Sequence, residues 1–434
     1  MRSSLATFGV HRNSPDEALM MEGVPLNNIA KRFGTPCFVY SRAALVSAFH
    51  RLDGALMAAR KGRPYLICYA VKANSNLAVL RLFAGLGSGF DIVSGGELMR
   101  VLEAGGDPCK IVFSGLGKTA AEIKLALEAN IKCFNIESEA ELDRVNAVAA
   151  SLAMKARISL RVNPDVDAKT HPYISTGLKN NKFGIAFDRA LEVYHRAQSL
   201  ANIHIVGVDC HIGSQLMDAT PLQEAMGRIV ALADALAEAG VPVHHICPGG
   251  GIGITYKDED TINLNDYAQA LEASLGLRDV ELLLEPGRVL VGNAGVLLSR
   301  VEFVKPTESK NFLVIDAAMN DLIRPSLYQA HHEVVMVEAA RADVAARVYD
   351  VVGPVCESAD VLAHSRSLAA HEGDVVAILS AGAYGFVMSS NYNSRPRAAE
   401  VMVDGDSAAL IRERETFDDL VRQERLQTIQ ANMD

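Results

Sequence analysis

The sequence has no tryptophan, and aromatic side chains make up only 6% of its 434 residues. It contains no uninterrupted apolar run of about 18 residues, so no transmembrane helix is expected. No short apolar segment follows Arg2, which argues against a signal peptide. Positive charge is in deficit, because 42 Lys and Arg face 52 Asp and Glu, which gives a net charge of −10. This balance argues against nucleic acid or a membrane as a partner.

Metal and nucleotide motifs are also missing. The seven cysteines are scattered and never spaced Cys-x-x-Cys, which favours free thiols in a reducing cytoplasm. No His-Glu-x-x-His motif or Cys/His cluster occurs, so no metal site is predicted. The Gly249–Gly253 segment lacks the last glycine of a dinucleotide fingerprint. Gly117-Lys118-Thr119 is not a P-loop, because Val112 stands where that motif needs glycine.

Hydrophobic residues are plentiful at 49%, enough for a large core. Between residues 43 and 290, short β-rich apolar runs alternate with helical patterns, of which Thr220–Ala239 is the clearest, with Thr220 as its cap and Gln223 completing a capping box. Apolar strands separated by amphipathic helices predict an α/β fold with a TIM-like (β/α)8 barrel. The eight expected strands are Tyr65–Val71, Gly89–Val93, Ile111–Phe113, Cys133–Ile136, Ala156–Val162, Ile205–Cys210, His244–Cys247 and Glu281–Leu284.

After about residue 295 the pattern changes to strands linked by turns. We expect strands at Val296–Val304, Asn311–Ile315, Glu333–Val337, Val344–Val352 and Val375–Leu379. Phe38–Tyr40 is a candidate for an additional strand, and a charged amphipathic helix is expected at about Thr416–Gln430. The sequence therefore predicts a barrel over residues 43–290 and a second, β-rich barrel or sandwich domain from residues 1–42 and 291–434.

Polar or glycine-rich segments follow the expected strands, at the face of a barrel where active sites are built. Lys72 is either a solvated lysine or, with a pKa depressed by partial burial, one that can form a Schiff base. The Gly249–Gly253 glycines either present N–H groups to an anion or permit a tight turn. Glu285 ends an apolar strand and needs a cation, which could be Arg288 or a ligand nitrogen. His211 could be a ligand, an acid–base group, a stacked ring or a core histidine.

Several motifs occur together in one order: Tyr69–Asn74, His211–Ser214, Gly249–Gly251, Glu285–Arg288 and Cys356–Ser358. This set resembles the bacterial diaminopimelate decarboxylases, which are fold type III, alanine-racemase-like enzymes that use pyridoxal 5'-phosphate (PLP). The resemblance runs from about residue 25 to about residue 425. Three further stretches are similar: the family's active-site loop at His171–Gly177 and Lys182–Ile185, Met319–Pro325, and Arg412–Leu420. His331 departs from the pattern, since many relatives carry tyrosine there.

The resemblance implies PLP-dependent decarboxylation of meso-2,6-diaminopimelate to L-lysine and CO2, the last step of lysine biosynthesis. It implies that Lys72 binds PLP covalently with Asp91 nearby, that His211 stacks on the pyridine ring, and that Glu285 pairs with the ring nitrogen. The residues implied to bind the phosphate are Ser214, Gly250, Gly251, Gly287, Arg288 and Tyr384.

For the substrate, the resemblance implies that Cys356 protonates the α-carbon and Glu357 reads the distal ammonium. Both would come from a neighbouring subunit, so a homodimer with shared active sites is expected. The groups implied to hold the distal carboxylate are Arg288, Arg324, Tyr328 and Tyr384. Three alternatives remain open: a decarboxylase for ornithine, arginine or lysine, where relatives usually carry aspartate at Glu357; an amino-acid racemase; and a non-catalytic PLP-binding protein.

Overall fold

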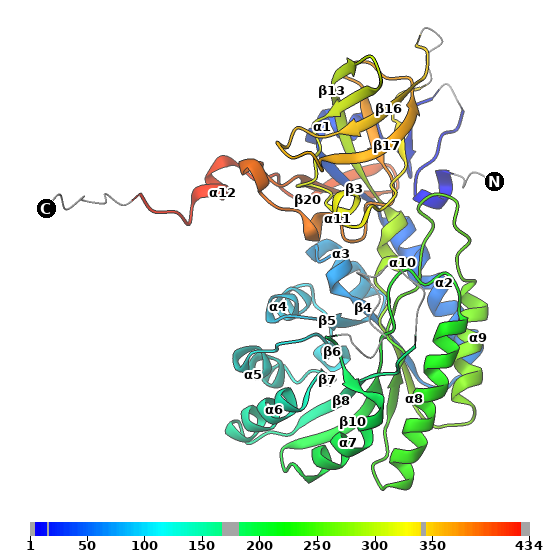
Figure 1. Ribbon diagram of the computed structural model, residues 1–434, viewed down its shortest axis with the longest axis vertical. Coiled ribbons are helices and arrows are strands. Elements are labelled where there is room, and N and C mark those ends of the chain that lie inside the picture. Colours follow the sequence, from blue (N-terminus) through cyan, green and yellow to red (C-terminus); the bar gives the residue numbers. More distant parts are fainter. Residues whose placement is uncertain (1–4, 15–16, 167–181, 340–343, 427–434) are drawn as a thin grey trace, which may run out of the picture. The chain divides into compact units, whose positions relative to one another are not determined.

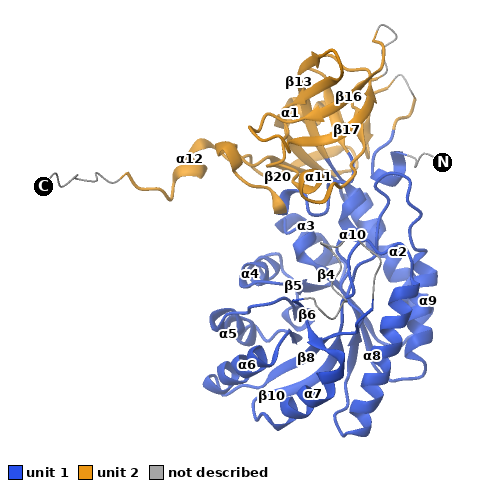
Figure 2. Ribbon diagram, in the orientation of Figure 1, with its two compact units in different colours: residues 1–11, 40–296, 379–387 blue, residues 12–39, 297–378, 388–434 orange. Residues whose placement is uncertain are grey.

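A computed structural model describes residues 5–14, 17–166, 182–339 and 344–426. The chain divides into two compact units, drawn in blue and orange in Figure 2. The barrel unit comprises Met1–His11, Tyr40–Val296 and Leu379–Val387, and the β unit comprises Arg12–Val39, Leu297–Ile378 and Met388–Asp434. In the barrel unit, the late segment Leu379–Val387 therefore joins a body that is otherwise formed by the first two thirds of the chain.

Parallel strands form the barrel, and it closes where β12 pairs with β4 (Figure 1). Each of the eight predicted strands is present, so the predicted barrel is confirmed. The two-residue strand β9 (Ile185–Ala186) pairs with β8 in addition. The barrel strands are β4 (Tyr65–Ala70), β5 (Gly89–Ile92), β6 (Ile111–Phe113), β7 (Cys133–Ile136), β8 (Ala156–Asn163), β10 (Ile203–Asp209), β11 (His245–Cys247) and β12 (Glu281–Leu284).

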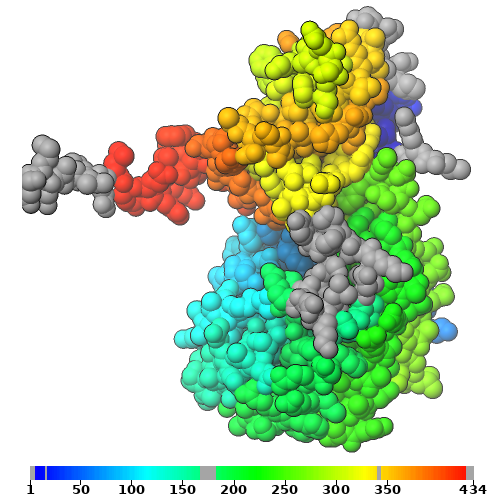
Figure 3. Space-filling model, viewed as in Figure 1, coloured from blue at the N-terminus to red at the C-terminus, as the bar shows by residue number. Residues whose placement is uncertain are grey.

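Helices cover the outside of the barrel, as expected for parallel strands that are apolar on both faces (Figure 1). In Figure 3, α4, α5 and α6 form the cyan surface of the barrel unit. The short helix α10 (Arg288–Val291) follows β12. The outer helices are α2 (Arg42–Arg60), α3 (Leu77–Gly85), α4 (Gly95–Glu103), α5 (Ala120–Glu128), α6 (Glu139–Ser151), α7 (Ala190–Ser199), α8 (Thr220–Glu238) and α9 (Leu264–Leu275). None of the described helices is long and apolar enough to cross a membrane.

Helix α8 has the predicted extent, but the prediction of its cap is wrong. Ala219 is the N-cap residue and no side chain caps the helix. Thr220 is instead the first helical residue, and its N–H and hydroxyl donate to Oδ1 of Asp218 at 3.0 and 2.9 Å. Asp218 therefore accepts hydrogen bonds from Thr220, the residue that was predicted to cap the helix.

The β unit contains a mixed sheet with the strand order β17-β16-β14-β13-β3-β19-β20, and β18 pairs with both β13 and β15. The predicted β-rich second body is confirmed, and the expected strand at Phe38–Tyr40 is present as β3 within this sheet. The strands are β1 (Met20–Met21), β2 (Val24–Pro25), β3 (Cys37–Ser41), β13 (Gly295–Pro306), β14 (Asn311–Ile315), β15 (Val334–Met336), β16 (Arg347–Val352), β17 (Val361–Leu368), β18 (Val375–Ile378), β19 (Ala399–Asp404) and β20 (Ser407–Arg412). The helices are α1 (Leu26–Phe33), α11 (Arg324–Tyr328) and α12 (Phe417–Val421).

The C-terminal helix predicted at Thr416–Gln430 is much shorter than expected. Thr416 and Asp419 do form a capping box, but α12 ends at Val421, and its prediction beyond residue 426 lies outside the described residues. No residue of α12 is buried. A helix that packs no apolar face has little tertiary stabilisation, and a charged pattern alone does not extend it.

The barrel interior is filled by two successive layers of side chains. The apolar layer is a cluster whose members are at most 9% exposed: Cys68, Val112, Cys133, Val206, Cys247 and Leu283. Side chains two residues apart on a strand share a face, so the next inward positions belong to one further layer. We call this the polar layer, and its members are Asp91, Ser114, Asn135, Asp209 and Glu285, all at most 6% exposed.

Candidate active site

Lys72 lies at the mouth of the barrel, in a single 3-10 turn (Val71–Ala73) directly after β4. Its Nζ donates to Oδ2 of Asp91 at 2.9 Å, and Asp91 is fully buried on the neighbouring strand β5. Burial lowers the pKa of Lys72, but attraction to Asp91, Tyr384 and Glu285 outweighs burial and raises this pKa above its ordinary value. The predicted depressed pKa of Lys72 is therefore wrong, because the sequence does not show that Asp91 faces the amine.

Glycines line the ends of β10, β11 and β12, where three backbones approach one another. Gly249 and Gly251 have φ angles of +79° and +97°, which side chains rarely adopt. A Cβ atom on Gly250 would lie 2.0 Å from the carbonyl oxygen of Glu285, and one on Gly251 would lie 2.3 Å from that of Gly213. The glycines therefore permit a tight turn with close backbone packing, and the N–H of Gly249 donates to Cys247 Sγ at 3.3 Å.

Arg288 brings a positive charge close to these glycines. It begins α10 and is 6% exposed; its Nη2 donates to Ser214 Oγ at 2.9 Å and its Nη1 to Tyr256 Oη at 2.5 Å. Its guanidinium carbon lies 4.8 Å from the centre of the Tyr384 ring, within the range of a cation–π contact. Tyr384 is tied to the turn of Lys72, because its N–H donates to the carbonyl of Ala73 at 2.8 Å.

His211 follows β10 and contacts the glycine turn at Gly250. Its Nδ1 accepts a hydrogen bond from the N–H of Gly250 at 3.2 Å, so this nitrogen carries no proton. Burial lowers the pKa of His211 well below its usual range, and the positive charges of Arg161 and Lys72 lower it further. The ring is therefore neutral near pH 7, which suits a flat packing surface better than an acid.

Glu285 lies in the polar layer, one residue past β12. Its Oε1 accepts a hydrogen bond from Nδ2 of Asn135 at 3.1 Å. Burial raises the pKa of Glu285 well above its ordinary value, and the nearby Asp91 and Asp209 raise it further. Among the described residues, Oδ1 of Asp91 and Oδ1 of Asp209 are buried without a hydrogen-bond partner. The polar layer therefore holds several carboxyl groups whose ionisation is disfavoured by burial and mutual repulsion, and a cationic ligand group would favour their ionised form.

One trio in the barrel has the residue types of a metal site. Asp209, Cys247 and Glu285 each offer a ligand atom, and these atoms lie within 4.8 Å of one another. Burial raises the pKa of the Cys247 thiol well above its ordinary value, and the two carboxylates add to this effect. A metal needs the thiolate, so a thiol that keeps its proton does not favour metal binding.

The remaining predicted site residues belong to the β unit, and each has surroundings within that unit. Arg324 begins α11, is buried, and places Nη1 2.8 Å from His332 Nε2; Tyr328 ends the same helix. Cys356 is exposed in the turn after β16, with its N–H donating to Asn393 Oδ1 at 2.9 Å. The carboxylate of Glu357 accepts a hydrogen bond from Tyr392 at 3.4 Å.

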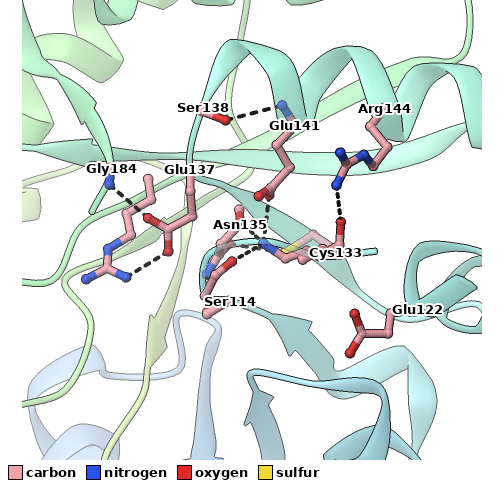
Figure 4. A network of polar contacts seen from close by, with 12 residues as sticks. Ser114, Glu122, Cys133, Asn135, Glu137, Ser138, Glu141, Arg144 and Gly184 are labelled. Carbon is pink, nitrogen blue, oxygen red and sulfur yellow. Dashed lines mark hydrogen bonds and ion pairs between the residues drawn. The ribbon is translucent and has the colours of Figure 1, made fainter. Parts of the chain in front are cut away.

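His331 and the predicted active-site loop lie outside this set of residues. His331, which departs from the family pattern, places Nε2 3.1 Å from the carboxylate of Glu333. Of the predicted loop, His171–Gly177 lies outside the described residues. In the second part of that loop, the N–H of Gly184 donates to Glu137 Oε2 at 2.8 Å, and the other oxygen of Glu137 pairs with Arg161 at 2.9 Å (Figure 4).

Asn135, Asp209 and Tyr256 have no predicted role from the sequence, yet the structure places them among the candidate site residues. Asn135 interrupts an apolar strand at an inward position, so alternation along Cys133–Ile136 was an available signal. A bulge at Val206 shifts the alternation of β10, so Asp209 gives no such signal. Tyr256 lies in a loop, and only the fold brings its hydroxyl to Arg288.

A match to a protein family defines the class of this molecule. The family described as "Pyridoxal-dependent decarboxylase, pyridoxal binding domain" matches residues 43–292, which is more than half of the chain. The barrel unit with Lys72 at its mouth is therefore a pyridoxal-binding domain of the decarboxylase type.

Comparison with individual relatives narrows this class. The diaminopimelate decarboxylase of Vibrio cholerae is 57% identical over 406 residues, covering 93% of this chain and 96% of that enzyme. The enzyme of Pseudomonas aeruginosa with the same name is 56% identical over 411 residues, covering 95% and 98%. The crystal structure of diaminopimelate decarboxylase from Helicobacter pylori complexed with L-lysine has 45% identity and a TM-score of 0.87, covering 92% of this chain and 98% of that one. The chain belongs to the diaminopimelate decarboxylase family, as its motifs indicated.

PLP is the cofactor of this class, and the described residues fit its two charged ends. Its phosphate is an anion, which matches the positive charge of the buried Arg288. Its ring nitrogen, when protonated, is a cation, which matches the raised pKa of Glu285 and the surplus of buried carboxylates around it. Its aldehyde requires a primary amine, and Lys72 is a primary amine at the mouth of the barrel.

Proposed function

We propose that this protein removes one carboxylate of meso-2,6-diaminopimelate as CO2 and forms L-lysine. The observation that carries the proposal is the pairing of Lys72 with Asp91, which sets a primary amine at the edge of the polar layer. Two comparisons support it: the high identity to diaminopimelate decarboxylases, and the bound L-lysine named for the Helicobacter pylori enzyme, which is the proposed product.

PLP, when bound, supplies an electron-withdrawing ring that takes up the electron pair left behind as CO2 departs. Lys72 holds the cofactor through its amine. Asp91, 2.9 Å from Nζ, holds this amine in place at the mouth of the barrel through an ion pair. His211 would pack its neutral ring against the cofactor, and Glu285 would pair with the ring nitrogen.

The phosphate and the substrate are held by different groups. We assign the phosphate to Ser214, Gly250, Gly251, Gly287, Arg288 and Tyr384. Arg324 and Tyr328 hold the distal carboxylate of the substrate, together with Arg288 and Tyr384. Glu357 pairs with the distal ammonium, and the thiol of Cys356 gives a proton to the α-carbon after CO2 has left.

We infer further that the active protein is a homodimer in which Cys356 and Glu357 complete the site of the neighbouring subunit. The exposure of both residues in a turn of the β unit supports this assignment. Residues 43–290, together with Tyr384, would then bind the cofactor, and residues 1–42 and 291–434 would supply substrate contacts and the interface. The seven free cysteines, two of them exposed, favour a cytoplasmic location.

Product analysis tests the reaction. The purified protein is incubated with PLP and, separately, with meso-diaminopimelate, ornithine, arginine or L-lysine, and products are identified by mass. We expect L-lysine and CO2 from diaminopimelate and far slower turnover of the other three. Preference for ornithine would contradict the assignment of Arg324 and Glu357, and racemisation without CO2 would contradict the reaction itself.

Mixing inactive variants tests the shared site. Lys72→Ala and Cys356→Ala subunits are each expected to be inactive alone. After exchange at equal amounts, half of the dimers are mixed and each contains one intact site, so about a quarter of the parent activity should return. No recovery, with exchange verified by mass, would contradict a site shared between subunits.

A further inference from the structure

Asn135 is an amide buried inside the barrel, where most strand residues are apolar. It is 1% exposed, and its Nδ2 donates to Glu285 Oε1 at 3.1 Å and to Ser114 Oγ at 3.0 Å. The hydroxyl of Ser114 lies 3.5 Å from the same Oε1 atom. Two neutral side chains from neighbouring strands therefore converge on one oxygen of Glu285. This leaves the orientation of the carboxylate little freedom.

Lys118 holds the backbone that carries these two side chains. It is 2% exposed, and its Nζ donates to the carbonyls of Gly115 at 2.7 Å and of Asn135 at 2.8 Å, and to Glu141 Oε1 at 2.7 Å. An ammonium has three donors, and all three are used here. Since Gly115 directly follows Ser114, one buried cation ties the ends of β6 and β7 together.

The surrounding network is extended, and each of its hydrogen bonds involves at least one side chain. Figure 4 shows Ser114, Asn135 and Glu141 close together, with Arg144 beside them. Arg144 Nη1 donates to the carbonyl of Lys118 at 2.9 Å, and the N–H of Glu141 donates to Ser138 Oγ at 3.2 Å. Burying such a network costs free energy unless every group is paired, so its presence beside Glu285 calls for a function.

We propose that Asn135 is a positioning residue for Glu285, and that Ser114 and the Lys118 anchor keep it in place. A carboxylate only accepts hydrogen bonds, so the amide nitrogen must face it, and it stabilises the ionised form. A neutral donor does this without adding positive charge, which would compete with a cationic ring nitrogen for Glu285. This inference rests on the proposed function, because the partner of Glu285 is the pyridine ring.

Other charged groups also face Glu285 and set the background for this effect. Asp91 on β5 and Asp209 on β10 disfavour its ionised form, whereas Lys72 and Arg161 favour it. Asn135 and Ser114 add donors where carboxylates are in excess. Their removal should make Glu285 hold its proton to a higher pH.

Asn135→Ala tests the proposal through PLP affinity, measured by equilibrium dialysis of the full chain between pH 5 and 9. We expect about tenfold weaker binding at pH 7, the usual effect of losing one hydrogen bond to a charged group. As the pH is lowered, Glu285 takes up a proton and PLP affinity should decrease. The pH at the midpoint of this decrease should be about one unit higher in the variant. The kcat for decarboxylation should fall with little change in KM.

Asn146→Ala is the matched control, since the side chain of Asn146 on α6 also forms a hydrogen bond, but one that it accepts from the N–H of Asn202 at 3.2 Å outside the barrel interior. The PLP affinity and pH midpoint of this control should equal those of the parent.

Ser114→Ala is a milder second variant if Asn135→Ala does not fold. About threefold weaker PLP binding is expected, because the contact of Ser114 with Glu285 is longer than that of Asn135. Parent-like affinity and midpoint in a folded variant would overturn the proposal. A parent protein that binds no PLP would instead overturn the proposed function.

Discussion

The apolar layer and the polar layer of the barrel lie next to each other, and on three strands their members are two residues apart, yet the layers differ in almost every physical property. Val112, Cys133 and Leu283 pack into a cluster without charge, whereas Ser114, Asn135 and Glu285 form hydrogen bonds across strands. Alternation along a strand makes both layers point inward. A single barrel can therefore keep its stability and its chemistry in adjacent layers.

Substitutions in the two layers should also have different effects on stability and function. Removing atoms from the apolar layer leaves a cavity, so stability falls while the site remains. Removing a charge from the polar layer relieves repulsion between buried carboxylates, so stability can be kept while function falls. Four substitutions test this difference, in order of the expected size of the effect.

Lys72→Ala should have the largest effect, because no other described group replaces the amine at the mouth of the barrel. Decarboxylation should fall at least about a thousandfold, with the unfolding midpoint in urea unchanged within error. Lysine production and urea unfolding measure the two quantities. Lys124→Ala, at an exposed lysine on α5, is the control and should keep full activity.

Glu285→Gln should lower activity about a hundredfold, because the neutral amide cannot balance a protonated ring nitrogen. The free energy of unfolding without PLP should not decrease, since the variant removes one of three neighbouring buried carboxylates. The control is Glu281→Gln, because Glu281 begins the strand that leads to Glu285 and is partly exposed; this variant should be active. A marked loss of stability in Glu285→Gln would contradict the division between the layers.

Leu283→Ala should produce the reverse pattern. Removing a buried leucine typically lowers the free energy of unfolding by about 3 kcal/mol, while the activity of the folded fraction changes little. Leu277→Ala, at a fully exposed leucine, serves as the control and should change neither quantity. Urea unfolding together with turnover normalised to folded protein decides between these outcomes.

Asp209→Asn should change activity least, and its effect should appear in the pH dependence of stability. Burial raises the pKa of Asp209 from 3.8 to about 7, so the folded protein keeps this proton to a higher pH than the unfolded chain. The free energy of unfolding without PLP should therefore fall as pH rises from about 4 to about 7. Asp209→Asn should reduce this slope by up to about 1.4 kcal/mol per pH unit, and exposed Asp258→Asn should not.

Much of the fold could be predicted because barrel strands are short apolar runs with clear boundaries. The β unit was harder to predict. The strand β17 (Val361–Leu368) has exposed polar residues in its middle and no regular alternation of burial, and the sequence did not predict it, nor did it predict β19 and β20. An edge strand such as β20, with no residue fully buried, carries almost no hydrophobic pattern. Strands of this kind are determined by their pairing partners.

The candidate site, too, has features that the sequence predicts and features that only the fold reveals. Residues that follow strand ends, such as Lys72 and His211, could be found from the pattern and from the resemblance. The pKa of Lys72 could not, because it depends on the distance to Asp91 on another strand. Likewise, the contact between Asn135 and Glu285 joins residues 150 positions apart, and only barrel closure brings them together.

The most direct test of the central claim is to locate the covalent attachment of PLP. The full-length protein is loaded with PLP, reduced with borohydride so that the link to an amine becomes permanent, digested, and mapped by mass spectrometry. The structure predicts that the added mass lies on the peptide containing Lys72 and is absent from Lys72→Ala. Attachment at another lysine, or none at all, would contradict the assignment of the polar layer as the cofactor site.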